Sequence, residues 1–243
     1  MSPILLEDLF QEPVATGAPT WDGSHLWRMI DESGGVAPDS VGSADLTLGG
    51  TTIAKVADGI EFGSANAVLS GVLSELSLDL TNLNAPYTWY VSCRAYDWGF
   101  SDWGRFVSYQ LNNTASVDTY IQITGSSLGA RKNSLGGSYY TWSNNVTVPS
   151  NLDFVLKRDP TSPASPAVSW LYLFVNGVLE ITTNWANSPF STPDEATTDF
   201  RIGNRTDLDR AWNGRMKWSG IRSVADDDST VLATVAAGRP VAP

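Results

Sequence analysis

The dipeptide Asn176-Gly177 constrains the fold of this chain more than any other feature of the sequence. Apolar runs flank it on both sides, LYLFV at 171–175 and VLEI at 178–181. Both Asn and Gly tolerate φ > 0, which a type I′ turn requires at its two central positions. The sequence therefore predicts a β-hairpin whose two antiparallel strands are joined by this two-residue turn.

Short apolar runs separated by turn residues recur along most of the chain. Gly, Asn, Asp, Ser or Pro separates nearly all of these runs, as expected for strands joined by turns. The expected strands lie at 46–48, 52–56, 60–62, 87–96, 105–111, 119–124, 153–157, 169–175, 178–183, 198–202 and 216–224. Because the spacing of βαβ units does not appear, the pattern predicts an all-β antiparallel fold, either a sandwich or a barrel.

One helix is expected, at 229–237 near the C-terminus. Three acidic residues at 226–228 precede it, and their charges suit the positive end of a helix dipole. Gly238 and Pro240 follow the run and are expected to end the helix.

Residues 1–20 differ from the rest of the chain. They hold a short apolar cluster made of Ile4, Leu5, Leu6, Leu9 and Phe10. Two interpretations stay open: a strand or helical turn packed on the parent domain, or an arm that docks on a partner or on a neighbouring copy. We divide the chain into an N-terminal arm, 1–20, and one domain, 21–243, because all-β domains of this length are common.

Charge and hydropathy exclude several classes of partner. Lys and Arg number 15 against 26 Asp and Glu, which gives a net charge of −11. A chain this acidic is a poor partner for nucleic acid or for an anionic membrane surface. Since no apolar run approaches the roughly 20 residues that cross a bilayer, we expect no membrane insertion. The first residues lack the basic region of a secretory signal peptide, so we expect a protein made in a cytosol and kept there, or exported inside a larger assembly.

The chain has one cysteine and one histidine. A single cysteine, Cys93, cannot form an intrachain disulfide, and its strand-like flanks predict a buried inert thiol. A single histidine, His25, excludes His-based zinc clusters. No G-x-S-x-G nucleophile motif accompanies His25, so we expect no catalytic role for it.

Two aromatic clusters are candidate carbohydrate-binding elements. Trp98, Phe100 and Trp103 stand beside Gly and Asp in an expected loop, and Tyr140 and Trp142 lie in the run YYTWSNN. Sugar rings have apolar C–H faces that stack on aromatic rings, while polar groups fix their orientation. The alternative is that these aromatic side chains close the sandwich edges or pack against a neighbouring subunit, since interfaces enrich the same residue types.

Several pieces of the sequence, taken in order, carry a resemblance to a known family. They are 26–34 (LWRMIDESG), 38–42 (PDSVG), 59–62 (GIEF), 87–92 (YTWYVS), 171–177 (LYLFVNG), 201–204 (RIGN) and 212–221 (WNGRMKWSGI). Together they resemble the concanavalin A-like superfamily, and within it the laminin G-like (LamG-type) jelly roll, over roughly residues 22–237. The resemblance implies an antiparallel two-sheet β-sandwich, found in lectins, matrix proteins, glycosidases and bacteriophage virion proteins.

The glycosidases of this superfamily use a Glu-x-Asp-x-x-Glu strand, which places paired carboxylates on one sheet face. None of the seven glutamates here forms that pattern. The nearest run, EDLFQE at 7–12, begins with two adjacent acids, which would point to opposite faces of a strand. We therefore predict that the protein is not an enzyme. Isolated acids such as Glu61 or Glu180 could still act from separate strands, although nothing in the sequence selects them.

Calcium is the only cofactor that the resemblance brings into consideration. LamG-type domains often hold one Ca²⁺ in rim loops, through carboxylates and carbonyl oxygens. The acid-rich loops here are 97–102, 207–209 and 226–228, and solvated turn residues are the alternative explanation for them. The metal ligands are left unassigned.

Two functions from different classes follow. The first is a non-enzymatic structural protein of a bacteriophage virion, as a capsid decoration, cement or tail-associated component. Such a protein would be made in the host cytoplasm, would contact other virion subunits or copies of itself through its N-terminal arm, and could adsorb to surface glycans. The alternative is a free lectin-like carbohydrate-binding module, and a glycoside hydrolase is the least favoured.

Overall fold

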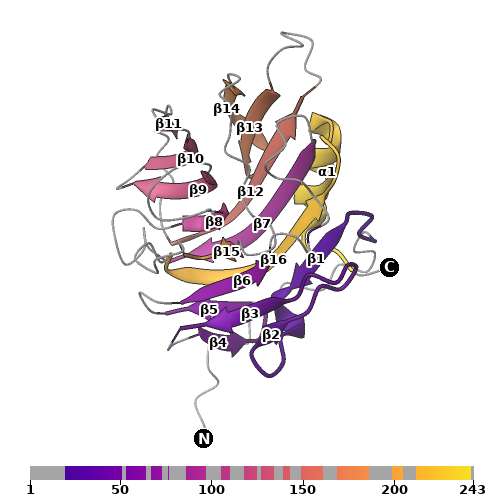
Figure 1. The fold of residues 1–243 in the computed structure, drawn as a ribbon, viewed down its shortest axis with the longest axis vertical. Coiled ribbons are helices and arrows are strands. Elements are labelled where there is room, and N and C mark those ends of the chain that lie inside the picture. Colours follow the sequence, from indigo (N-terminus) through magenta and orange to yellow (C-terminus); the bar gives the residue numbers. More distant parts are fainter. Residues whose placement is uncertain are drawn as a thin grey trace, which may run out of the picture.

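A computed structural model describes most of the body of the chain. The described residues are 20–50, 53–63, 67–72, 76, 86–96, 105–109, 118–124, 127–133, 139–142, 149–160, 169–185, 199–204 and 212–241. They form two antiparallel β-sheets and one α-helix, α1 (Asp228–Ala237) (Figure 1). The predicted all-β sandwich with a short C-terminal helix is therefore confirmed, and the N-terminal arm lies outside the described residues.

The first sheet has the strand order β14-β13-β12-β7-β16-β5-β4, and β1 also pairs with β16. Its strands are β1 (His25–Arg28), β4 (Ile53–Val56), β5 (Gly59–Phe62), β7 (Tyr87–Ala95), β12 (Ser150–Asp159), β13 (Ser169–Val175), β14 (Val178–Trp185) and β16 (Gly214–Arg222). Neighbours in this order, such as β5 and β16, come from distant parts of the sequence.

The second sheet has the order β11-β10-β9-β8-β15-β6-β3-β2. Its strands are β2 (Val36–Ala37), β3 (Leu46–Gly49), β6 (Val68–Val72), β8 (Arg105–Tyr109), β9 (Asp118–Thr124), β10 (Ser127–Asn133), β11 (Tyr139–Trp142) and β15 (Asp199–Ile202). A short 3-10 helix, η2 (Met29–Asp31), follows β1. Within the described residues, no helix has the length and apolar character that crossing a bilayer would require.

The β13–β14 hairpin forms at the predicted dipeptide. Asn176 has φ 50° and Gly177 has φ 79°, so both central residues adopt the positive φ of a type I′ turn. The turn also contacts β12, because the Asp153 backbone N–H donates to Asn176 Oδ1 at 2.9 Å and the Asn176 N–H donates to the Asp153 carbonyl at 2.8 Å. The hairpin prediction is confirmed.

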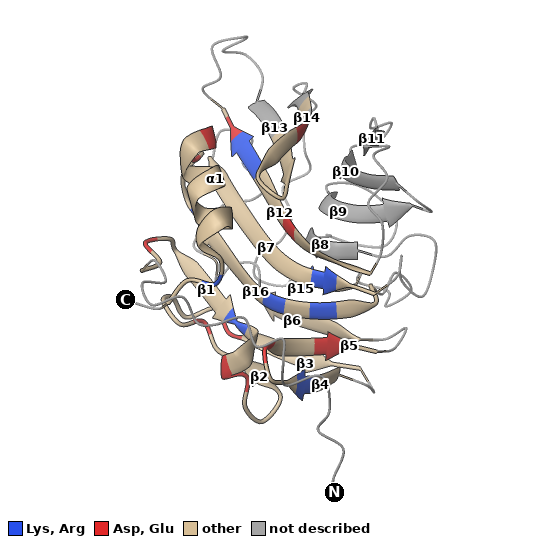
Figure 2. Cartoon of the chain, turned by 180° about the vertical axis from the view of Figure 1, so that it is seen from behind, with Lys and Arg blue, Asp and Glu red and all other residues tan. Residues whose placement is uncertain are grey.

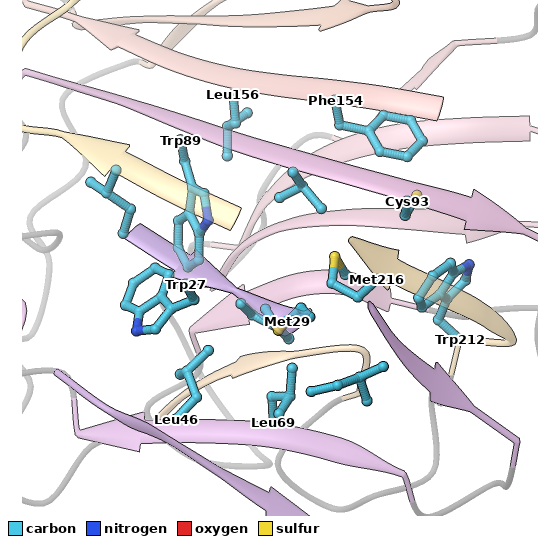
Figure 3. Close-up of a cluster of buried hydrophobic side chains, with 14 of the residues drawn as sticks. Trp27, Met29, Leu46, Leu69, Trp89, Cys93, Phe154, Leu156, Trp212 and Met216 are labelled. Carbon is cyan, nitrogen blue, oxygen red and sulfur yellow. The ribbon is translucent and has the colours of Figure 1, made fainter. Parts of the chain in front are cut away.

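The main core lies between the two sheets. Trp89 and Phe154 of the first sheet and Leu46 and Leu69 of the second belong to one buried cluster (Figure 3). Cys93 is in the same cluster, and burial raises the pKa of its thiol well above the ordinary value. The predicted buried thiol is confirmed, and its raised pKa disfavours the reactive thiolate.

A second apolar cluster lies on the outer face of the first sheet, under α1. It joins Trp218 of β16 and Tyr90 of β7 to Val231 of α1. The helix begins one residue before the predicted start of 229, with Asp227 as N-cap, whose carboxylate accepts from the Thr230 backbone N–H at 2.7 Å. The sheet face under α1 is therefore closed.

Candidate functional site

The side chains of the predicted carbohydrate-binding residues lie outside the described part of the chain. Trp98, Phe100 and Trp103 lie outside the described residues. Tyr140 and Trp142 belong to β11, an edge strand of the second sheet, where their backbones pair with Ala130 and Leu128 of β10, while their side chains are outside the described part. These residues remain predictions.

Of the three acid-rich loops considered for calcium, only 226–228 lies in the described residues. Asp226 accepts from the Tyr90 hydroxyl at 2.5 Å, Asp227 caps α1, and Asp228 pairs with Lys157 Nζ at 2.8 Å. Each of these carboxylates already has a protein partner, so this loop anchors the helix. Within the described residues, no group of three acidic, His or Cys side chains is arranged to hold a metal ion.

Four side chains form a row across the outer face of the first sheet, which we call the outer polar row. The register places Arg215 of β16 opposite both Glu61 of β5 and Arg94 of β7, and places Arg94 opposite Asn151 of β12. Since neighbouring strands lie about 4.8 Å apart, the row spans roughly 15 Å. Figure 2 shows basic positions on β16 and an acidic position on β5, with α1 at the other end of these strands.

Strand alternation directs these side chains outward. Successive residues of a strand point to opposite faces of the sheet. Arg94 is exposed while both its neighbours, Cys93 and Ala95, are fully buried in the main core. Glu61 likewise stands between two fully buried core residues, Ile60 and Phe62.

A β-bulge separates the row from the closed part of the face. The register of β16 against β7 shifts between Met216 and Trp218, so Lys217 is the extra residue. One inserted residue reverses the inward–outward phase. Met216 therefore packs in the main core, while Trp218 packs outward under α1.

Tyr96 extends the row at the end of β7. It is half-buried and hydrogen-bonded to Glu61 and to Arg215. Burial, followed by the hydrogen bond to Glu61, raises the pKa of Tyr96, so its neutral hydroxyl donates to the carboxylate. The hydroxyl of Tyr96 thus joins the Glu61 carboxylate to the Arg215 guanidinium.

Arg215 is held by acidic partners. Its Nη1 lies 2.7 Å from Asp58 Oδ1. Burial acts to lower the pKa of Arg215, but the charge of Asp58 and the nearby Tyr96 outweigh it and raise the pKa above the ordinary value. Arg215 is therefore a fixed cation whose charge is largely offset.

The row lies at the end of the sheet from which three connecting segments depart. Ala95, at the end of β7, pairs with Ser150 at the start of β12 and with Gly214 at the start of β16. The Tyr96 N–H donates to the Asn213 carbonyl at 3.2 Å. The chain passes directly from Tyr96 into the segment that carries Trp98, Phe100 and Trp103, so the predicted aromatic cluster and the outer polar row adjoin in sequence.

His25 serves the packing of a loop. Its Nδ1 lies 2.6 Å from Asp39 Oδ2 and its Nε2 lies 2.5 Å from the Leu76 carbonyl, and the imidazole is buried. Burial acts to raise the pKa of Asp39, but hydrogen bonds from His25 and from the backbone N–H groups of Leu26 and Gly42 lower it overall. The pair holds the 39–44 turn against β1.

Sequence reasoning missed most of the row. Glu61 appeared only as an isolated acid, and Arg94, Tyr96, Asn151 and Arg215 were not singled out. The available signal was a charged residue between two apolar ones, as in GIEF at 59–62 and CRA at 93–95. That alternation indicates an outward face, but it does not indicate which strands lie side by side.

Comparisons with solved structures identify the fold. Trypanosoma rangeli sialidase in complex with 2,3-difluorosialic acid matches with TM-score 0.66 and 11% identity, over 90% of this chain and 33% of that one. The binding domain of botulinum neurotoxin serotype G matches with TM-score 0.63 and 12% identity, over 88% of this chain and 51% of that one. The chain thus spans between a third and about half of these proteins.

At these identities the likeness shows the fold alone, an antiparallel two-sheet β-sandwich. No family model matches the sequence. No curated protein matches it either.

Proposed function

We propose that this protein is a non-enzymatic carbohydrate-binding module on a LamG-type β-sandwich. The observation that carries the proposal is the outer polar row on the first sheet. It presents a carboxylate, two guanidinium groups and an amide on a sheet face that is apolar where the helix covers it. Ligand sites commonly combine a few fixed polar groups with an apolar or aromatic surface. The half-buried Tyr96 supplies an aromatic ring next to the row, while the apolar cluster under α1 is closed to a ligand.

The individual groups suit a polyhydroxylated ligand. Asn151 and Arg94 are exposed, so their amide and guanidinium groups are available for hydrogen bonds. An amide both donates and accepts, while a guanidinium only donates. The ring of Tyr96 can contact the apolar face of a sugar, and the predicted aromatic residues Trp98, Phe100, Trp103, Tyr140 and Trp142 would add further stacking surfaces.

Binding without hydrolysis is part of the proposal. Glycoside hydrolysis uses two carboxyl groups on opposite sides of the scissile bond, one of them a proton donor. In the outer polar row Glu61 accepts from Tyr96, and the nearby Asp58 is paired with Arg215. We expect no release of reducing ends when the protein is incubated with any oligosaccharide that it binds.

A glycan array followed by calorimetry tests the function. We expect the wild-type protein to bind a subset of glycans, and Asn151→Ala to weaken that binding. Thr182→Ala, at an exposed position of β14 in the same sheet, is the control and should leave binding unchanged. Absence of binding to every glycan on the array would contradict the proposed function.

The virion role predicted from the sequence is a second proposal. It rests on the apolar residues Ile4, Leu5, Leu6, Leu9 and Phe10 of the N-terminal arm, which lie outside the described residues. Deletion of residues 1–20 should prevent incorporation into a particle. Unchanged incorporation of the shortened protein would remove this proposal.

A further inference from the structure

We infer that the outer polar row binds an acidic saccharide and that Arg94 binds its carboxylate. This inference rests on the proposed function, since it names the ligand class of the same site. It starts from the surroundings of Arg94, an exposed side chain. No ion pair or hydrogen bond of its guanidinium is present in the described part of the chain.

None of the four neighbours of Arg94 on the sheet face carries a negative charge. Across the strands it stands opposite Arg215 on one side and Asn151 on the other. Along its own strand, the next residues on the same face are Ser92 and Tyr96. The nearest carboxylate by register on this face, Asp153, stands opposite Ser92 and therefore diagonal to Arg94. Within the described residues no ion pair joins the two side chains, so the guanidinium of Arg94 has no paired carboxylate there.

The pairing of Arg94 with Arg215 adds to the argument. Like charges directly opposite each other on a sheet destabilise it. Asp58 offsets the charge of Arg215 at 2.7 Å, while Arg94 lacks such a partner within the described residues. A bound anion would give Arg94 the counter-charge that Asp58 already gives Arg215.

The chemistry of the row selects a carboxylate attached to a polyhydroxylated ring. The planar guanidinium of Arg94 can make two parallel hydrogen bonds to a carboxylate. Asn151 on one side and Tyr96 on the other would face the hydroxyl groups next to that carboxylate. The net charge of −11 repels an anion at long range, so recognition has to come from the local contact with Arg94.

The test uses carboxylated oligosaccharides, ending in a hexuronic acid or in sialic acid, and their carboxyl-reduced counterparts. We expect wild-type protein to bind at least one carboxylated probe about tenfold or more tightly than its reduced form, as one charge-assisted bidentate pair gives. Arg94→Ala should abolish this preference. Arg94→Lys should lose most of it, because an ammonium lacks the planar fork.

Arg239→Ala is the matched control, because it removes the same charge from a half-exposed arginine beyond α1, and it should keep the preference. Equal affinity for carboxylated and reduced probes, or an unchanged preference in Arg94→Ala, would overturn the inference while the proposed function stands. If sulfated probes bind as tightly as carboxylated ones, the site recognises oxyanions in general, and the assignment of a carboxylate ligand is wrong. Absence of binding to all probes and to neutral glycans would overturn the proposed function as well.

Discussion

Lys157 of β12 is joined to Asp228 in the first turn of α1, with its Nζ 2.8 Å from Asp228 Oδ1. The lysine is buried on the outer face of the first sheet, and its ammonium lies 4.5 Å from the ring centroid of Tyr172 and 5.2 Å from that of Phe174. It therefore connects the helix to the sheet both by charge and by contact with aromatic rings.

We expect Lys157→Met to destabilise the protein by about 1–2 kcal/mol, the sum of a partly exposed ion pair and two cation–π contacts. Methionine keeps most of the apolar stem, so the loss reports on the ammonium. Urea unfolding measures it, and hydrogen exchange should show faster opening of α1. Asp228→Asn is the control. Because Asp228 is largely exposed, this variant should lose less stability than Lys157→Met. An equal or larger loss would contradict the contribution of the ring contacts.

The N-cap Asp227 should make the stability of the protein depend on pH in the acidic range. Hydrogen bonds from Ser229 and from the Thr230 backbone N–H lower the pKa of Asp227 to about 2. A carboxyl whose pKa is lowered by folding stabilises the folded state above its unfolded pKa of 3.8 and loses this contribution as the pH falls towards 2. Asp227→Asn keeps a capping side chain but removes the titration, so its melting temperature should vary less than that of the wild type between pH 4 and pH 2.

Tyr90 and Asp226 form a buried pair with the opposite pH dependence. Burial raises the pKa of Asp226, and the hydrogen bond from Tyr90 and the charge of Arg222 offset only part of this rise. The cost of ionising Asp226 is therefore absent below its unfolded pKa of 3.8 and appears as the pH rises through its folded pKa.

Tyr90→Phe removes a donor to this carboxylate and should destabilise the protein at pH 7 by about 1–3 kcal/mol. The loss should be smaller at pH 4, because a larger fraction of Asp226 is then protonated. Urea unfolding at both pH values checks this. In a double-mutant cycle with Asp226→Asn, a coupling energy near zero at pH 7 would contradict the prediction.

Local sequence signals were sufficient for the hairpin and the helix. Asn176-Gly177 specifies its turn through the φ angles of two adjacent residues. Gly238 ends α1 as predicted, and the acidic run 226–228 supplies the N-cap, Asp227, one residue before the helix starts at Asp228. Strand β10 was missed, because SLGARKN has neither clear alternation nor β-branched residues. Its pairing with β9 across a short connection places it in the sheet, which single-strand propensity does not show.

The outer polar row could not be predicted from the sequence for a different reason. Its members stand at positions 61, 215, 94 and 151 and meet only through the strand order β5-β16-β7-β12. Local periodicity specifies which face each side chain occupies, but long-range pairing decides its neighbours. The bulge at Lys217 adds a second uncertainty, because it reverses the face of every later residue in β16.

Substitution of Asp58 should change the affinity for an acidic saccharide in the direction opposite to Arg94→Ala. Asp58→Asn removes the carboxylate that pairs with Arg215 at 2.7 Å, so the positive charge next to Arg94 increases. If the outer polar row binds the carboxylate of an acidic saccharide, its affinity should rise about two- to tenfold at low salt. Because both partners are partly exposed, the variant should lose only about 0.2–1 kcal/mol of stability.

Calorimetry with a carboxylated probe and its carboxyl-reduced form, at low and at physiological ionic strength, measures the effect of Asp58→Asn. The gain should be confined to the carboxylated probe and should shrink as salt screens the added charge. Asp31→Asn, which removes a carboxylate paired with Arg28 outside the row, is the matched control and should leave both affinities unchanged. An equal gain for the reduced probe would mean that Asp58 acts through the shape of the site, and it would argue against a charge-based role for the two opposed arginines.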